Sequence, residues 1–224
     1  MARYRQLSEY DVEDRTYSIA EWLELERRTG KKFEYHEGRL LPFEMMAGGT
    51  FEHSVISNNV GGALYRRFYD EGLPARCRTC SSDLQIKIPG TGRYLLPDGA
   101  VVCGAPAYDT TVKTAVRNPV VVVEVLSESS EGYDAGEKFE YYSALPTLRH
   151  YLLVSQEESR VEVRTRTDAA DGWHFTYVRA ADGEIDLPAI GLTLTMPELY
   201  FGVTFEEEGG GGSGGEAEAP PAPV

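Results

Sequence analysis

The chain has 224 residues, of which 42% are hydrophobic, and a formal net charge of −14 at pH 7. This composition predicts a globular protein with one sizeable core, and no stretch approaches the ~18 to 20 continuous apolar residues of a membrane span. The strong negative charge argues against a protein that holds duplex nucleic acid through a broad basic face, because such binding depends on neutralised phosphates.

Both ends of the chain predict extensions of a single domain. Residues 1–16 are rich in charge and predict a loose lead-in without the apolar core of a signal peptide, so we expect a cytoplasmic protein. Residues 206–224 consist mainly of Gly, Glu, Ala and Pro and predict a disordered tail. That tail holds five acids and no base, which leaves a charge of −9 on residues 1–205. The domain is therefore expected to span residues 17–205.

The first part of the domain predicts two helices separated by a hairpin. Ser18 and Glu21 form a capping box at the start of a helix that ends at Gly30. Residues 33–43 alternate in the manner of a β-hairpin. Thr50 caps a second helix, which runs to about residue 72 and must pack its apolar stripe against a sheet.

The rest of the domain predicts a mixed sheet. The strand candidates are residues 75–80, 83–88, 94–96, 100–103, 120–126, 150–154, 161–165 and 173–177. A helix from Asp134 to Leu145, ended by Pro146, separates two of the apolar strands, and this order is typical of a crossover connection. The expected fold class is α/β, with a mixed β-sheet flanked by helices.

The three cysteines predict free thiols in a reducing compartment, because their number is small and odd. Cys77 and Cys80 form a lone C-x-x-C motif. A structural zinc site normally needs four ligands, and Cys103 is the only other thiol. A strand that carries two half-buried thiols is the favoured interpretation.

Glu124 is the most informative residue, because it stands in the apolar run Val120–Leu126. Strand alternation places Glu124 on the same face as Val122 and Leu126, where a core packs. A lone carboxylate there costs several kcal/mol, as a rough estimate, unless a cation or donor meets it. The alternative is that Glu124 lies at the end of the strand, already in solvent.

Asp98 supplies a second carboxylate between two apolar segments. Alone, Pro97-Asp98 is a common turn dipeptide. If the strand after Asp98 neighbours the strand that carries Glu124, the two carboxylates can share one hard cation such as Mg²⁺.

Lys138 is the only lysine after Glu124 in a chain with five lysines. Its spacing from Tyr141, Tyr142 and Leu145 places it beside an inward apolar stripe of the predicted helix. The spacing is equally consistent with a surface ion pair between Asp134 and Lys138, so both interpretations stay open.

Together these residues resemble the Uma2 family of restriction endonuclease-like proteins, a branch of the PD-(D/E)XK nuclease superfamily. The resemblance extends from the first helix to the strand at residues 150–154. It rests on Pro97-Asp98, Glu124-Val125-Leu126-Ser127 and Asp134-x-x-x-Lys138 followed by Tyr142. The superfamily places a lysine two positions after the glutamate, where this chain has Leu126. The resemblance implies that this family carries the lysine on the following helix, where Lys138 is the candidate.

The resemblance implies a Mg²⁺- or Mn²⁺-dependent endonuclease that hydrolyses phosphodiester bonds in DNA, with the metal on Asp98 and Glu124. Lys138 and Glu34 complete the implied catalytic set, and a homodimer is expected by analogy. On the sequence alone, Glu34 is equally consistent with a solvent-facing residue of the hairpin. His53 is a candidate for contacting phosphate or, more favoured, for capping its helix, while Gln85 and Lys87 could line the cleft. Lys87 is also the replacement lysine if Lys138 points outward. The alternatives are a catalytically silent nuclease-fold module for binding or assembly, and a metal-dependent hydrolase acting on another phosphoester or a small substrate.

Overall fold

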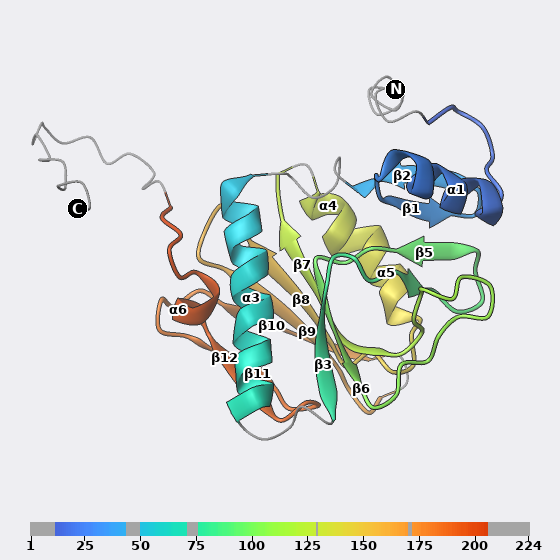
Figure 1. The fold of residues 1–224 in the computed structure, drawn as a ribbon. Helices are drawn as coiled ribbons and strands as arrows, with labels where there is room; N and C mark the ends of the chain where they lie inside the picture. The colour runs from blue at the N-terminus through green and yellow to red at the C-terminus, as the bar shows by residue number, and fades with distance from the viewer. Residues whose placement is uncertain (1–11, 44–49, 71–75, 129, 170–171, 206–224) are drawn as a thin grey trace, which may run out of the picture.

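A six-stranded mixed sheet forms the centre of the protein in a computed structural model (Figure 1), which describes residues 12–43, 50–70, 76–128, 130–169 and 172–205. In spatial order the strands are β10 (Trp173–Val178), β9 (Val161–Arg166), β8 (His150–Ser155), β7 (Pro119–Leu126), β6 (Gly99–Cys103) and β3 (Cys77–Ser81). Only β7 and β8 run parallel; the other neighbours are antiparallel. The expected mixed sheet with a crossover connection is confirmed.

A smaller four-stranded sheet lies at one end of the molecule with the first helix. Its order is β2 (Arg39–Pro42), β1 (Phe33–His36), β5 (Arg93–Leu95) and β4 (Ile86–Lys87). Helix α1 (Ile19–Thr29) begins with the predicted Ser18 capping box and ends at Gly30, which has a left-handed backbone. Trp22 of α1 packs on Tyr35 and Tyr94 of the sheet. Val12, from the predicted lead-in, is buried in the same cluster.

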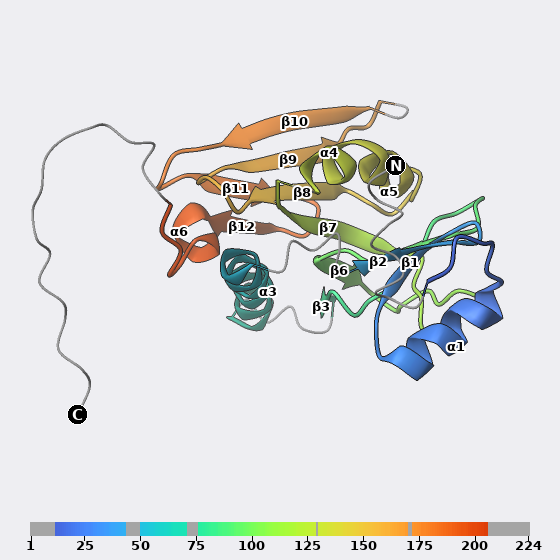
Figure 2. The same ribbon diagram turned by 90° about the horizontal axis from the view of Figure 1, so that it is seen from above.

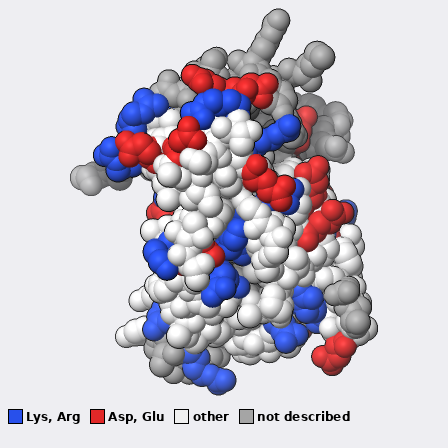
Figure 3. Space-filling view, turned by 90° about the vertical axis from the view of Figure 1, so that its right-hand side faces the viewer, with Lys and Arg blue, Asp and Glu red and all other residues white. Residues whose placement is uncertain are grey.

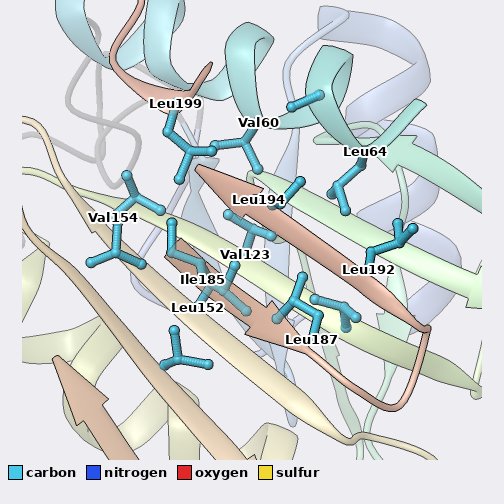
Figure 4. Close-up of a cluster of buried hydrophobic side chains, with 14 of the residues drawn as sticks. Val60, Leu64, Val123, Leu152, Val154, Ile185, Leu187, Leu192, Leu194 and Leu199 are labelled. Atoms are coloured by element: carbon cyan, nitrogen blue, oxygen red, sulfur yellow. The ribbon is translucent and has the colours of Figure 1, made fainter. Parts of the chain in front are cut away.

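One face of the central sheet is covered by α3 (Phe51–Asp70) and by the C-terminal elements (Figure 2). These are the two-stranded sheet of β11 (Glu184–Leu187) and β12 (Leu192–Thr195), and helix α6 (Met196–Leu199). Their apolar side chains meet Val123 of β7 and Leu152 and Val154 of β8 in one buried cluster (Figure 4). We did not predict β11, β12 or α6 from the sequence.

The opposite face is covered by the crossover between β7 and β8. It comprises α4 (Glu131–Tyr133), a π-helical turn η3 (Asp134–Lys138) and α5 (Phe139–Ser143). Tyr142 and Leu145 pack there on Val122 and Leu126 of β7. The predicted helix over residues 134–145 is therefore present, but its first part is wound more widely than an α-helix, a feature that is frequent at functional sites.

The cysteine prediction is wrong, because Cys77 and Cys103 form a disulfide. They are directly opposite each other in the antiparallel pair of β3 and β6. Cys80 is free, since residues three apart in a strand face opposite sides of the sheet. The C-x-x-C spacing therefore marks neither a zinc site nor a pair of free thiols, and the cysteines give no support for a reducing compartment. Within the described residues, no helix is both long and apolar enough to cross a membrane.

We expect the disulfide to stabilise the fold measurably. It links positions 26 residues apart, and closing a loop of that length in the unfolded chain is worth about 3.5 kcal/mol. Cys103→Ser should therefore lower the free energy of unfolding in urea by about 2 to 4 kcal/mol, whereas Cys80→Ser, which removes the free thiol, should change it little. Equal stability of Cys103→Ser and the wild-type protein under non-reducing conditions would contradict this expectation.

Candidate functional site

A buried cluster of charged side chains lies between the two sheets and the crossover. The ammonium Nζ of Lys138 is 3.0 Å from Glu124 Oε2, 3.4 Å from Asp134 Oδ1 and 3.5 Å from Glu34 Oε1. It also donates to the carbonyl oxygen of Leu96 at 3.1 Å. The π-helical turn begins at Asp134 and ends at Lys138, and both side chains are buried. Lys138 thus points inward, and its Asp134 contact is part of a buried cluster, not a surface pair.

Glu34 is completely buried, and its two carboxylate oxygens are both engaged. Oε1 accepts from the backbone N–H of Leu96 at 3.0 Å, in addition to facing Lys138. Oε2 accepts from the hydroxyl of Tyr133 at 2.8 Å and lies 3.1 Å from Nε2 of His36. The solvent-facing interpretation of Glu34 is therefore wrong. The hairpin strand β1 delivers this acid to the cluster.

Asp98 lies next to Glu124 across two neighbouring strands. Gly99 pairs with Val123 in the antiparallel register of β6 and β7, so Asp98 and Glu124 are the next positions along the two strands. Oδ2 of Asp98 accepts from the backbone N–H of Val125 at 2.7 Å. The structure thus brings together the two carboxylates that the sequence proposed as metal ligands.

His53 approaches the same carboxylate from helix α3. Its Nε2 lies 3.3 Å from Oδ2 of Asp98, which is within ion-pair range although the geometry is not that of a hydrogen bond. The favoured capping role for His53 is wrong, because Thr50 caps the helix by accepting from the backbone N–H of His53 at 3.0 Å.

Gln85 and Lys87 are not brought to this cluster. Gln85 donates to Glu26 and accepts from Thr114. Lys87 donates to the carbonyl oxygen of Thr91 and lies over the ring of Tyr94, 4.3 Å from its centroid. Since Lys138 points inward, Lys87 is not needed as the replacement lysine.

His36 and Tyr133 belong to the cluster but were not predicted as site residues from the sequence. Both side chains meet Glu34 and lie 3.3 Å apart through Nε2 and the hydroxyl. They stand 97 positions apart in the chain, so only the fold brings them together. Residues two apart on a strand share a face, so the spacing of Glu34 and His36 could have predicted that their side chains lie together.

The cluster carries more negative than positive charge, and the pKa values reflect this. Burial alone would lower the pKa of Lys138, but Glu124, Glu34 and Asp134 together raise it well above its usual value, so the ammonium stays charged. Burial raises the pKa of Glu34, but Lys138 and His36 outweigh it and the net shift is downward.

Glu124 shows the opposite balance. Burial raises its pKa well above the usual range, Lys138 only partly opposes this, and the charges of Asp134 and Asp98 raise it further. One ammonium therefore does not satisfy all of these carboxylates, and a further cation would stabilise the ionised form of Glu124.

The oxygens at Asp98 and Glu124 fit a hard divalent cation that keeps water ligands. Within the described residues, Oε1 of Glu124 is buried without a hydrogen-bond partner. Those residues contain no group of three or more His, Cys, Asp or Glu side chains arranged to hold a metal ion. A site for zinc enclosed by protein ligands is thus not supported there, whereas Mg²⁺ is commonly bound by one or two carboxylates, waters and substrate phosphate.

A comparison with protein families identifies the chain. Residues 19–197 match the model of the Uma2 family, described as "Putative restriction endonuclease". The chain belongs to the Uma2 family. The matched range includes Glu34, Asp98, Glu124 and Lys138, and the expected family membership is confirmed.

Relatives of the chain share most of its length. It is 36% identical over 188 residues to the uncharacterized protein slr1290 of Synechocystis sp., a match that covers 84% of this chain and 93% of the relative. A second Synechocystis protein of the same description, sll1609, is 29% identical over 75% of this chain and 91% of its own length. The crystal structure of a "putative nuclease" from Anabaena variabilis has the same fold, with a TM-score of 0.62 at 15% identity, covering 82% of this chain and 97% of that one.

We expect Lys138→Met to destabilise the protein strongly. The substitution leaves the neighbouring carboxylates buried without their cation, which costs about 3 to 5 kcal/mol of unfolding free energy. Lys87→Met is a matched control, because Lys87 makes no contact with the cluster, and it should cost less.

The loss in Lys138→Met should grow as the pH rises. Without the ammonium, the cluster carboxyls have a higher pKa in the folded state than in the unfolded state, so the folded variant binds more protons and loses stability with increasing pH. Urea unfolding at acidic and at alkaline pH measures this trend. A variant as stable as the wild-type protein at alkaline pH would show that Lys138 does not stabilise the cluster.

Proposed function

We propose that this protein is a Mg²⁺- or Mn²⁺-dependent nuclease that hydrolyses phosphodiester bonds in DNA. The proposal rests on the contacts of the two carboxylate oxygens of Glu124. Lys138 holds one of its carboxylate oxygens, and the other is buried without a hydrogen-bond partner among the described residues. Asp98 stands at the neighbouring position on the adjacent strand. Family membership and fold support the same reaction class.

Asp98 and Glu124 would hold the metal. Such an ion polarises the phosphoryl group and lowers the pKa of a bound water. The backbone N–H of Val125 orients Asp98 by donating to its Oδ2. His53 approaches the same oxygen. These contacts fix the carboxylate before substrate arrives, which reduces the reorganisation needed for reaction.

Lys138 and Glu34 are positioning residues in this proposal. An ammonium has three donor hydrogens, and four oxygen atoms surround that of Lys138. Glu34 likewise uses both of its oxygens. Lys138 therefore keeps Glu124 in place and neutralises part of its charge, while Glu34 holds Lys138 against the sheet.

DNA binding would depend on the site more than on a broad basic face. Acidic and basic side chains are interspersed on the face shown in Figure 3. Arg66 and Arg67 on α3 both pair with Glu198, so this basic pair is partly neutralised within the protein.

Two copies of the chain would supply the two sites that cutting both strands requires, and we propose a homodimer on this ground.

The alternative is a catalytically silent module with a nuclease fold. The burial of the cluster favours this alternative. Glu124 and Lys138 are only 1% and 2% exposed, so their ion pair can have a purely structural role. Calorimetric titration with Mn²⁺ separates the two functions, because the nuclease requires binding and the silent module does not. No heat of binding at millimolar metal would favour the silent module.

The nuclease proposal is tested by cleavage of plasmid and single-stranded DNA with Mg²⁺ or Mn²⁺. Glu124→Gln and Asp98→Asn keep the side-chain shape but remove the charge, and we expect each to reduce the cleavage rate by roughly 100-fold or more, because metal binding is lost. Asp83→Asn is the matched control, since Asp83 is an exposed acid whose contact is with Lys32.

The control should cleave at the wild-type rate, and EDTA should stop all cleavage. Equal cleavage by wild-type protein and folded Glu124→Gln would assign the activity to a contaminant or to another site. Circular dichroism spectra of all variants establish that each is folded.

A further inference from the structure

A groove of about 460 Å³ runs between helix α3 and the edge of the central sheet, and Asp98 lies in its lining. Ser57, Asn58 and Gly61 line it from α3, and Thr79 and Ser81 line it from β3. This volume is within the range of small-ligand pockets, about 300 to 1,000 Å³. The groove therefore reaches Asp98, one of the two proposed metal ligands.

The lining of the groove suits a neutral group with hydrogen-bonding edges. Its walls carry hydroxyls and an amide, and its floor includes Val123 and Val125. Among the described residues that line it, Asp98 is the only charged one. A phosphate inside it would meet no basic side chain of the described residues and one carboxylate. An apolar floor with a few polar groups above it is instead the usual composition of a site for a flat, uncharged ligand.

One further observation is consistent with a ligand in the groove. Gly61 lies in the interior of α3, where glycine is unfavourable for the helix. A Cβ built there meets no atom within 4 Å, so packing does not require glycine at this position. A larger side chain would occupy the groove.

We propose that the groove binds the nucleoside next to the scissile phosphate, with the sugar and base between α3 and β3 and the phosphate outside, at Asp98. This inference rests on the proposed nuclease function and adds the part of the substrate that the protein holds. The protein would then gain affinity from an uncharged portion of the nucleic acid, which is consistent with its net charge of −14.

The test uses Gly61→Leu, which fills the groove from the helix side, and Tyr69→Leu as a control on an exposed position of the same helix outside the groove. Metal-free, ¹⁵N-labelled protein is titrated with adenosine and with thymidine. We expect saturable shifts of the amide signals of Gly61, Gly62 and Thr79 in the wild-type protein and in Tyr69→Leu. Gly61→Leu should bind at least tenfold more weakly and cleave DNA correspondingly more slowly.

Gly61→Leu should melt at or above the wild-type temperature, because leucine favours helix more than glycine does. Gly61→Ala, with a smaller obstruction, provides a second folded variant with a weaker effect. Absence of nucleoside-dependent shifts, or equal binding by wild-type protein and Gly61→Leu, would overturn the groove assignment even if DNA is cleaved. Nucleoside shifts in a wild-type protein that cleaves nothing would support the groove and reject the nuclease.

Discussion

The contact between the ammonium of Lys138 and the carboxylate of Glu124 is the interaction on which the site depends. A buried carboxylate in a valine-rich strand is unstable without a cation, and a buried lysine is equally unstable without an anion. The two groups are 3.0 Å apart, so each charge stabilises the other. The carbonyl oxygen of Leu96 and the carboxylates of Glu34 and Asp134 also contact the ammonium. Four separate parts of the chain, at residues 34, 96, 124 and 134–138, are thereby held together.

The strand β7 serves two purposes because its side chains alternate. Val121, Val123 and Val125 pack under α3 and the C-terminal hairpin, while Val122 and Leu126 pack under α5, with Glu124 between them. The core on both faces fixes the register of this strand, since a shift of one residue would exchange its two faces. The position of Glu124 relative to Asp98 is thus set by the same packing that stabilises the sheet.

The sequence allowed prediction of the elements whose signals are local. The Ser18 capping box, the Thr50 cap and the apolar strand at Glu124 lie where their residues indicated, because capping and alternation depend on near neighbours. The disulfide between Cys77 and Cys103 was missed, because it follows from which strands pair, and pairing partners are not local information. The contact of Tyr133 with Glu34 spans 99 positions and was missed for the same reason.

We propose that Asp98 and Glu124 form one cation site beside Lys138. The most direct measurement is anomalous X-ray diffraction from a crystal grown with Mn²⁺, in the wild-type protein and in Glu124→Gln. We expect one anomalous peak in the wild-type crystal, at about 2.1 to 2.3 Å from a carboxylate oxygen of each of the two acids, and its loss in the variant. A peak elsewhere in the molecule, or none at millimolar Mn²⁺, would contradict it.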